Sequence, residues 1–507
     1  MVLQDTLGFP MWTALLCVAI ILAYLYTTQW FRFWKQYGYP EGPPCRPFFG
    51  CIGELFNPKS STTRCITDWQ KKYGRVIPMF WFWDPMLVVT DPDVLRDITV
   101  KNFNVWSDRY MLGHGDLQQK IIKKGVFFAD GASWKRIRRI MTPTFSSNKL
   151  KNLTHFMNLT SCRLAKKMKD YAVAGEPASA KNCFAAYALD VICGTAFGLD
   201  TNSMKDSRVP FMKHAQSLMS FDKYLQMRLT VVGLFPWMSK LFKMFNIGFF
   251  MNRDVRFFEE NIMAIIRERK ANGADQNHSD FLQLLLNAEA LDNDEIVGEK
   301  KLTTEEISAQ GIIFVIAGYE TTSSTLQFLS YELGRNHDVQ EKMADEIESF
   351  LGKEDPNYYN VKKLKYMNAV INETLRMYPP IHLLSRQAEV DTTINGRTVP
   401  AGTAVMIPVA NINRDPEFFP EPTSFRPERF MDKHKENINP LTFLPFGYGP
   451  RQCIGIRLAM MEVKIALVHM LRKVRITSAT PEHLELEEFT GVLVPKTPIQ
   501  LNLQAVL

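Results

Sequence analysis

Cys453 is the residue of this chain whose neighbours point most clearly to chemistry. It stands in the string Phe446-Gly-Tyr-Gly-Pro-Arg-Gln-Cys-Ile-Gly455. A single cysteine in an apolar sequence is most often an inert buried thiol. Here the three glycines permit positive φ and let the backbone approach something large and flat. Nearby backbone N–H groups and a helix starting just after Cys453 favour the thiolate, which predicts a ligand for iron rather than an inert thiol.

A second group of residues that could take part in chemistry lies in Ala317-Gly-Tyr-Glu-Thr-Thr322. Glycine inside a helix costs up to about 1 kcal/mol relative to alanine, and small residues there leave room beside the helix. The Thr321 hydroxyl can bond the carbonyl of the preceding turn and admit water, and Glu320 can deliver protons. The alternative is a helical Glu and Thr that face solvent.

Charged residues at helical spacing form a third set. Glu373 and Arg376 are separated by one helical turn and share a helix face. Read alone, this is an exposed ion pair worth a few tenths of a kcal/mol. Trp134 and Arg138 have a similar spacing, and each arginine taken singly is expected to be a solvated surface charge.

The cysteine string resembles the haem-binding loop of the cytochrome P450 family, F-G-x-G-x-R-x-C-x-G, at all six fixed positions. A chance match in a chain of this length has a probability below about 10⁻⁵. The other motifs follow in the family's order, so the resemblance covers nearly the whole chain. It implies a mainly α fold with small β-sheets, a haem b cofactor, and Cys453 as the ligand of its iron.

The resemblance also assigns roles to the other residues. It implies that haem propionates are bound by Trp134, Arg138, Arg386 and Arg451, with Phe446, Gly447 and Ala317 also against the cofactor. It implies a structural set of Glu373, Arg376 and Arg429, and an acid–alcohol pair, Glu320 and Thr321, that supplies protons to the oxygen being reduced. Substrate contacts carried over by position are Phe314, Ala317, Ile381, Leu384, Val492 and Leu493.

The intact acid–alcohol pair favours a monooxygenase that inserts one atom of O2 into a lipophilic small molecule such as a steroid, fatty acid or xenobiotic. Two rivals are a haem-thiolate isomerase of a lipid peroxide, which needs no proton delivery, and a non-catalytic haem sensor. Several of the motifs quoted above are most similar to those of the family's microsomal branch, which includes broad-specificity drug and steroid oxidases and thromboxane synthase. His382 departs from that branch, either as a core histidine or as a polar contact to substrate.

The elements that position these residues follow from patterns along the chain. Thr303 and Glu306 form a capping-box signature, which predicts one long helix from there to about Gly334. Ile394 to Val399 carries an Asn-Gly turn typical of a hairpin. Thr403–Pro408 reads as a strand, and helical periodicity is expected from Ile454 to about Arg475.

The N-terminus is expected to anchor the chain in a membrane. Leu7 to Tyr26 has no charge and matches the roughly 20 residues needed to cross a bilayer. Arg32 and Lys35 follow the span, which places the rest of the chain on the cytosolic side. We therefore expect an anchor over 1–30, a proline-rich hinge over 31–50 and a single catalytic domain over 51–507, at the endoplasmic reticulum membrane with one pass.

Residues 233–252 hold many Phe, Met and Trp side chains. They belong either to the core or to a surface patch that dips into the bilayer. The net charge is +7, but the basic residues do not form a stripe interleaved with aromatic residues, as they would in a nucleic-acid binder. The eight cysteines form no C-x-x-C pair, which argues against a zinc ribbon.

Electrons must come from another protein, because the chain has no G-x-G-x-x-G motif after a strand and no flavin signature. NADPH is therefore expected to act indirectly, through NADPH-cytochrome reductase, with cytochrome b5 as a second candidate donor. The basic side chains Lys135, Arg136, Arg139, Lys149 and Lys151 are either a docking surface for that acidic partner or a solvated face.

Overall fold

A computed structural model describes residues 11–55, 61–111, 117–206, 208–271, 280–287, 301–488 and 491–506. Its helices are α2 Met11–Gln29, α3 Phe33–Gln36, α4 Ile52–Leu55, α5 Thr62–Tyr73, α6 Pro92–Arg96, α7 Lys120–Lys123, α8 Gly131–Met141, α9 Ser147–Ala174, α10 Ala180–Phe197, α11 Pro210–Met219, α12 Lys223–Leu234, α13 Met238–Met244, α14 Asn252–Ala271, α15 Phe281–Leu286, α16 Thr304–Leu333, α17 His337–Leu351, α18 Lys365–Met377, α19 Val409–Asn413, α20 Asp432–Glu436 and α21 Ile456–Leu471. The strands are β1 Val76–Trp81, β2 Asp84–Val89, β3 Ala178–Ser179, β4 Leu383–Gln387, β5 Thr392–Ile394, β6 Arg397–Val399, β7 Ala404–Pro408, β8 Val474–Thr480, β9 Leu486–Glu487, β10 Val494–Pro495 and β11 Gln500–Ala505.

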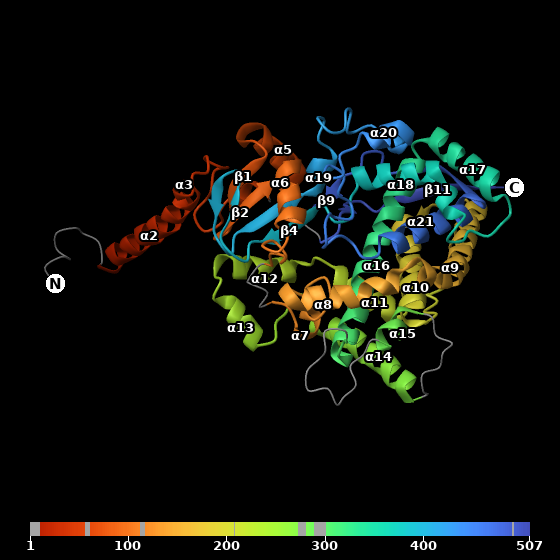
Figure 1. The fold of residues 1–507 in the computed structure, drawn as a ribbon, viewed down its shortest axis with the longest axis horizontal. Coiled ribbons are helices and arrows are strands. Elements are labelled where there is room, and N and C mark those ends of the chain that lie inside the picture. The colour runs from red at the N-terminus through yellow and green to blue at the C-terminus, as the bar shows by residue number, and fades with distance from the viewer. Residues whose placement is uncertain are drawn as a thin grey trace.

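The expected fold class is confirmed, because helices dominate and the sheets are small. The largest sheet has the order β1-β2-β7-β4, in which β2 and β7 are parallel and the other pairs are antiparallel. It lies beside the anchor helix α2, whereas most helices pack together on the other side of the molecule (Figure 1). A second sheet, β3-β11-β8, closes the helical side.

Helix α16 runs through the centre of the helical half. The predicted capping box is present: the Thr303 hydroxyl accepts from the Glu306 N–H, and the Glu306 carboxylate accepts from the Thr303 N–H. The helix continues for 30 residues to Leu333, about 45 Å at the usual rise per residue. It packs against α10, α14 and α18 and so brings the middle of the chain into the core.

Three other predicted elements are present, one of them shortened. The Asn395-Gly396 turn has positive φ at both residues and joins β5 to β6, and β7 covers the predicted strand. Helix α21 begins as expected but ends at Leu471, so the helix predicted to run to about Arg475 was too long. Val474 instead opens β8 and pairs with Ala505, since β-branched residues there pack well in a sheet.

Helix α2 and the residues that follow it are long and apolar enough to cross a membrane, over Trp12–Gln36. The side chains of α2 are mostly exposed, and the helix projects from one end of the molecule (Figure 1). This fits the predicted anchor over the part of the span that is described, while residues 7–10 lie outside the described residues. The predicted domain boundaries stay a prediction.

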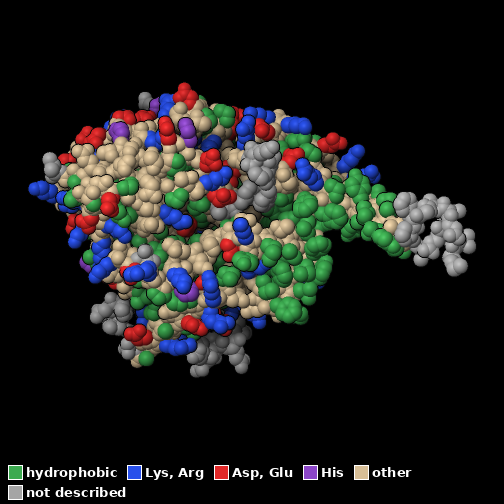
Figure 2. All heavy atoms as spheres, turned by 180° about the vertical axis from the view of Figure 1, so that it is seen from behind, with side chains coloured by type: hydrophobic (Ala, Val, Ile, Leu, Met, Phe, Trp, Pro, Cys, Tyr) green, Lys and Arg blue, Asp and Glu red, His purple; other side chains and the backbone are tan. Residues whose placement is uncertain are grey.

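The aromatic segment 233–252 lies on the surface in most of its length, which removes core packing as its general explanation. Trp237 is 61% exposed and Phe245 is 67% exposed, and Phe235, Met244 and Ile247 are exposed as well. Among its Phe, Met and Trp side chains Phe250 alone is buried. Figure 2 shows apolar side chains gathered on the lobe beside the anchor helix.

Candidate active site

Helix α16 is buried at every residue from Glu306 to Leu333 except in its middle. The exceptions are Ile316, Ala317, Gly318 and Thr321. Ala317 is exposed, and the other three are half-buried. A helix that crosses the core yet exposes one face at its midpoint must border a recess there. The recess is therefore lined by the small residues of the predicted oxygen-activation motif.

The Thr321 hydroxyl donates to the Ala317 carbonyl, with Oγ1 and O 2.6 Å apart. This confirms the predicted bond to the preceding turn, which draws that carbonyl away from purely helical pairing. Glu320 is buried next to Thr321, and burial raises the pKa of its carboxyl, a change that Lys181 partly opposes. The predicted acid–alcohol pair is thus an alcohol at the recess and an acid that readily holds a proton.

The cysteine loop is shaped by its own backbone. The Cys453 N–H donates to the Phe446 carbonyl over 2.9 Å, and Gly447 and Gly449 have φ of +71° and +74°. A Cβ on Gly449 would lie 2.0 Å from the Thr99 carbonyl oxygen, so the close approach at this glycine is to the protein itself. Gly455 has a φ of −90°, so the prediction of positive φ was wrong at that position.

The Cys453 side chain is exposed, yet enough protein surrounds the sulfur for burial to raise the pKa of its thiol. The two observations agree if the sulfur lines a recess inside the fold. The Gly455 N–H, at the cap of α21, and the charges of Arg138 and Arg109 lower that pKa in opposition. The backbone N–H and the positive charges that were predicted to stabilise the thiolate are present, but burial has the larger effect on the pKa.

A cluster of arginines, made of Arg109, Arg138, Arg386 and Arg451, lies around this recess. Burial is the main cause that lowers the pKa of each guanidinium, to about 10 in Arg386 and about 9 in Arg451. Mutual repulsion adds to the effect in Arg109 and Arg451. Such a cluster is costly unless anions bind to it.

The predicted propionate ligands Trp134, Arg138, Arg386 and Arg451 are therefore close together or in contact with one another. The guanidinium of Arg451 lies 4.2 Å above the Trp134 ring, and its Nε and Nη2 donate to the carbonyls of Ser107 and Ala129. Arg451 Nη1 and Arg386 Nε are buried and have no hydrogen-bond partner among the described residues. These orphaned N–H groups fit the carboxylates of a dianionic group.

Arg109 belongs to the same cluster and was missed by the sequence reasoning. Its Nη1 donates to the Phe127 carbonyl over 2.6 Å, and its guanidinium stacks on the Phe127 ring. It stands in Val105-Trp-Ser-Asp-Arg109, apart from every recognised motif. No spacing signal in a single sequence marks it, because only the fold brings it beside Arg386.

The Glu373–Arg376 pair is fully buried. The expectation of an exposed ion pair, which came from the helical spacing alone, was therefore wrong. Arg376 binds the carboxylate through two bonds of 2.8 Å each. Its remaining N–H groups donate to the carbonyls of Asn413, Pro422 and Ser424. Arg429 Nε lies 3.4 Å from Glu373, which places the predicted third member beside the pair.

The residues predicted to contact substrate occupy different environments. Phe314 is buried on α16 and packs against Phe145 and Phe281, while Ile381, Leu384 and Val492 are half-buried. Leu493 is buried, and its backbone bonds to Pro380 and to the Ser324 hydroxyl. That last contact ties the C-terminal segment to α16.

His382 is buried, with Nε2 2.6 Å from the Glu488 carbonyl oxygen. A carbonyl accepts, so Nε2 carries the proton and Nδ1 is an acceptor, which has no partner among the described residues. Burial lowers the pKa of His382 and keeps it neutral. The core-histidine reading accounts for one nitrogen, and a contact from Nδ1 to substrate stays a hypothesis.

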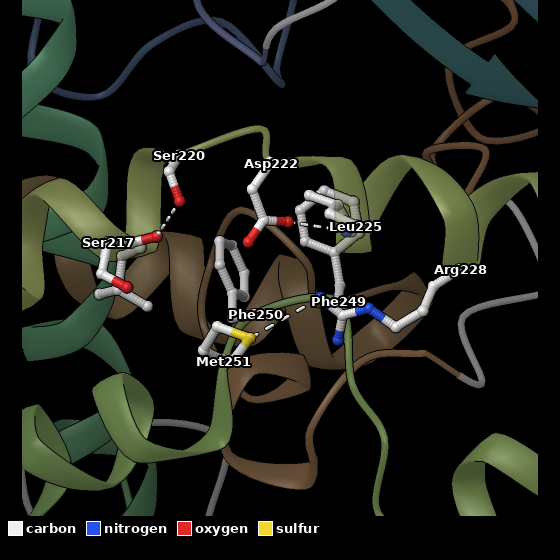
Figure 3. A pocket seen from close by; sticks show the side chains of 9 residues that line it. Ser217, Ser220, Asp222, Leu225, Arg228, Phe249, Phe250 and Met251 are labelled. Atoms are coloured by element: carbon white, nitrogen blue, oxygen red, sulfur yellow. Dashed lines mark hydrogen bonds between the residues drawn. The ribbon is translucent and has the colours of Figure 1, made fainter.

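A separate small pocket lies where α11 gives way to α12, and Figure 3 shows it from close by. It measures about 230 Å³ including the part open to solvent. Asp222 caps α12 through the Leu225 N–H, and Arg228 reaches the Met251 sulfur. None of the predicted site residues lines this pocket, so it is distinct from the recess at Cys453.

Comparison with known proteins agrees with this geometry. A family model described as cytochrome P450 matches residues 40–503. Cytochrome P450 3A29 from Sus scrofa is 36% identical over 96% of this chain and 95% of its own length. Cytochrome P450 3A13 from Mus musculus is 36% identical and cytochrome P450 3A6 from Oryctolagus cuniculus 37% identical, each over 96% of this chain and at least 95% of its own.

The chain belongs to the cytochrome P450 family. It is therefore a haem-thiolate monooxygenase that uses haem b, and NADPH supplies its electrons through a reductase. The residues present fit that cofactor: Cys453 would hold the iron, and the orphaned arginine N–H groups would hold the propionates. When bound, the haem supplies activation of O2, with the thiolate favouring O–O cleavage.

Proposed function

We propose that this P450 oxidises a lipophilic small molecule of the steroid, fatty-acid or xenobiotic class. The observation that carries the proposal is the exposed middle of α16, where Ala317 and Thr321 border a recess and the apolar Phe314 lies one turn before Ala317. Such a site binds apolar molecules because it removes their surface from water.

Glu320 and Thr321 act as the proton supply of the site. Burial of Glu320 raises the pKa of its carboxyl above the ordinary value, which favours the protonated form that a proton donor needs. Thr321 holds its hydroxyl at the recess through the bond to Ala317. The hydroxyl can therefore position a water or donate a hydrogen bond beside the reacting oxygen, while Glu320 replaces the proton.

Replacing Thr321 with alanine tests this assignment. Product formed per NADPH consumed should fall by about tenfold or more, with hydrogen peroxide in its place, because proton delivery typically contributes 10²–10⁴-fold. Thr325→Ala is a matched control, since Thr325 makes the same kind of bond to the Thr321 carbonyl one turn later. Equal coupling in both variants would refute the relay, and product without NADPH would favour the isomerase.

We propose NADPH-cytochrome reductase as the electron donor, with cytochrome b5 as a second donor. Lys135, Arg139 and Lys149 are exposed, so an acidic surface can approach their positive charges. Arg136 is engaged with Glu306 and the Lys301 carbonyl, so it contributes less. Turnover with reductase should fall as ionic strength rises to the physiological range. Turnover that ignores salt would refute electrostatic docking at this surface.

We propose that the protein lies at the endoplasmic reticulum membrane, facing the cytosol, with the aromatic segment in the lipid. Trp83 links this segment to the anchor. Its Nε1 donates to the Leu234 carbonyl at the end of α12, and its carbonyl accepts from Trp30 Nε1. Tyr26 of α2 packs on the Trp83 ring. The anchor and the exposed aromatic residues therefore face one membrane together (Figure 2).

Tryptophan quenching by brominated phospholipids tests this placement. In holoenzyme reconstituted into such bilayers, Trp237→Phe should remove part of the quenchable fluorescence, because Trp237 is exposed on the proposed lipid-facing surface. Trp69→Phe, a change at a buried tryptophan, is the control and should leave the quenched fraction unchanged. Unchanged quenching in Trp237→Phe would contradict the placement.

A further inference from the structure

A second cluster of reactive side chains lies where α9 packs against α21, and the proposed function uses none of it. Asn158 and Cys162 are one turn apart on α9, and His469 stands near the end of α21. Cys162 Sγ lies 3.5 Å from His469 Nδ1, and His469 Nε2 lies 2.8 Å from Asn158 Oδ1. Cys162 is exposed, whereas His469 is buried. A thiol, a base and an amide are thus arranged in line.

The hydrogen bonds assign the proton positions. Asn158 Nδ2 donates to the Pro356 carbonyl over 2.8 Å, which fixes the amide and turns Oδ1 toward the imidazole. Because Oδ1 can only accept, His469 Nε2 must carry the ring proton. Nδ1 is then a lone pair facing the Cys162 thiol. This is the arrangement in which an imidazole removes a proton from a nucleophile.

Both partners are neutral at rest. Burial lowers the pKa of His469 and raises the pKa of the Cys162 thiol. Asp355, Arg472 and Lys473 are the charged groups that act on both side chains, the first opposing the two cations. The pair therefore begins as thiol and free base, and the proton moves when an electrophile arrives.

The surroundings favour an anionic partner. Asp355 has the largest single charge effect and raises the pKa of the thiol, while two cations, Lys473 and Arg472, lower it, so positive charges outnumber negative ones. Arg472 is held in place by bonds from Nη2 to the carbonyls of Gly352 and Glu354. Its Nε is buried and has no partner among the described residues. With two cations to one carboxylate around an exposed thiol, the site is suited to a reagent that carries a carboxylate.

We propose that Cys162 is a modification site that exchanges with small anionic disulfides, with His469 as its base and Asn158 as the residue that positions the base. The thiol S–H bond breaks and its proton goes to His469 Nδ1. The Cys162 sulfur bonds to one sulfur of the disulfide, whose S–S bond breaks. The departing thiolate takes the proton from His469. Cys162 is oxidised to a mixed disulfide, and one reagent sulfur is reduced to a thiol.

The test measures mass addition to the holoenzyme, in which Cys453 is held by haem, in a Cys17→Ser background that removes the exposed thiol of the anchor. Oxidised glutathione is the anionic probe, cystamine the cationic one and hydroxyethyl disulfide the neutral one. At pH 7, His469→Gln should slow exchange at Cys162 by about tenfold or more. Glutamine keeps a donor for Asn158 but is no base, so the packing is retained.

Two further readouts separate a base from a structural residue. The rate ratio between the two proteins should shrink at alkaline pH, where the thiol ionises unaided, and Asn158→Leu should show the same pH dependence as His469→Gln. Oxidised glutathione should react faster than cystamine, and Lys473→Gln should reduce that preference.

Equal rates in the wild type and His469→Gln at pH 7 would overturn the assignment of the base. A preference for cystamine would overturn the assignment of the anionic ligand. If the histidine variant does not fold, the wild-type profile decides. A rate that stays level across neutral pH and falls only when the imidazole is protonated supports the base, whereas a rate that rises about tenfold per pH unit throughout, as for an unassisted thiol, refutes it. Mass addition is read on the protein itself, so the result is independent of the substrate that the haem site oxidises.

Discussion

Replacing Arg376 with methionine should prevent stable assembly of the haem protein. Methionine retains the apolar volume of the side chain and removes all five hydrogen bonds that the guanidinium makes. Glu373 would remain buried with the Arg426 N–H and with Arg429 at 3.4 Å. The carbonyls of Asn413, Pro422 and Ser424 would lose their donor as well.

The magnitude follows from these contacts. Removing one partner of a buried ion pair costs about 3–5 kcal/mol, and carbonyls left without a donor add about 1–3 kcal/mol each where water cannot replace it. A total of at least about 4 kcal/mol is a large part of the 5–15 kcal/mol that typically separates native from unfolded protein. The three carbonyls also precede the cysteine loop, so haem retention should fall with stability.

The assay is haem content per chain, together with the urea midpoint of the holoenzyme followed by haem absorbance and by tryptophan fluorescence. Arg163→Met is the matched control. Arg163 also binds a carboxylate through two bonds, to Asp200, but both side chains are partly exposed. Its loss should cost about 0–1 kcal/mol.

A double variant sharpens the test. Adding Glu373→Leu to Arg376→Met removes the uncompensated charge, so the double variant should be less destabilised than the sum of the single variants. The reasoning is refuted if Arg376→Met matches Arg163→Met in haem content and in urea midpoint. It is also refuted if the two single effects simply add.

Two further predictions concern single positions. Gly449→Ala should lower the haem content and should lower the stability by well over 1 kcal/mol, because its Cβ would lie 2.0 Å from the Thr99 carbonyl oxygen. Gly396→Ala is the control: Gly396 has the same φ of +74° with open space around it, so this variant should show only the cost of the backbone conformation. Equal losses in the two variants would contradict the steric explanation. Burial lowers the pKa of His382 below 6.5, so the unfolded chain binds more protons and unfolding becomes easier as pH falls below 6.5. His382→Gln should make that acid decline shallower by up to about 1.4 kcal/mol per pH unit in urea titrations at pH 7.5 and 5.5, and an unchanged slope would show that His382 does not titrate on unfolding.

Elements governed by local signals could be predicted from the sequence. The capping box at Thr303 and the Asn395-Gly396 turn depend on residues within a few positions of each other, and both are present. The cysteine loop was found because its motif lies within ten residues. The end of α21 was missed, since the pairing of Val474 with Ala505 joins distant segments and overrides helical periodicity.

Properties that arise from three-dimensional packing could not be predicted in the same way. The spacing of Glu373 and Arg376 is identical for a surface pair and a buried one. The difference comes from distant residues, whose carbonyls at Asn413, Pro422 and Ser424 accept from Arg376. Arg109 joins the arginine cluster through the fold alone. Trp237 is apolar like a core residue, yet it is 61% exposed, and its residue type alone does not distinguish the two cases.

The contacts of Trp83 make the N-terminal helix more than a tether. If the connection to the helix were flexible, the catalytic domain would reorient freely relative to the membrane. Here Tyr26 packs on the Trp83 ring and Trp30 Nε1 donates to the Trp83 carbonyl. The Trp83 indole in turn donates from Nε1 to the Leu234 carbonyl at the end of α12. The helix and the body should therefore tilt as one unit, so the angle at which the enzyme meets the bilayer is set by its fold, and a shortened chain lacking the helix would lose that fixed angle as well as its anchor.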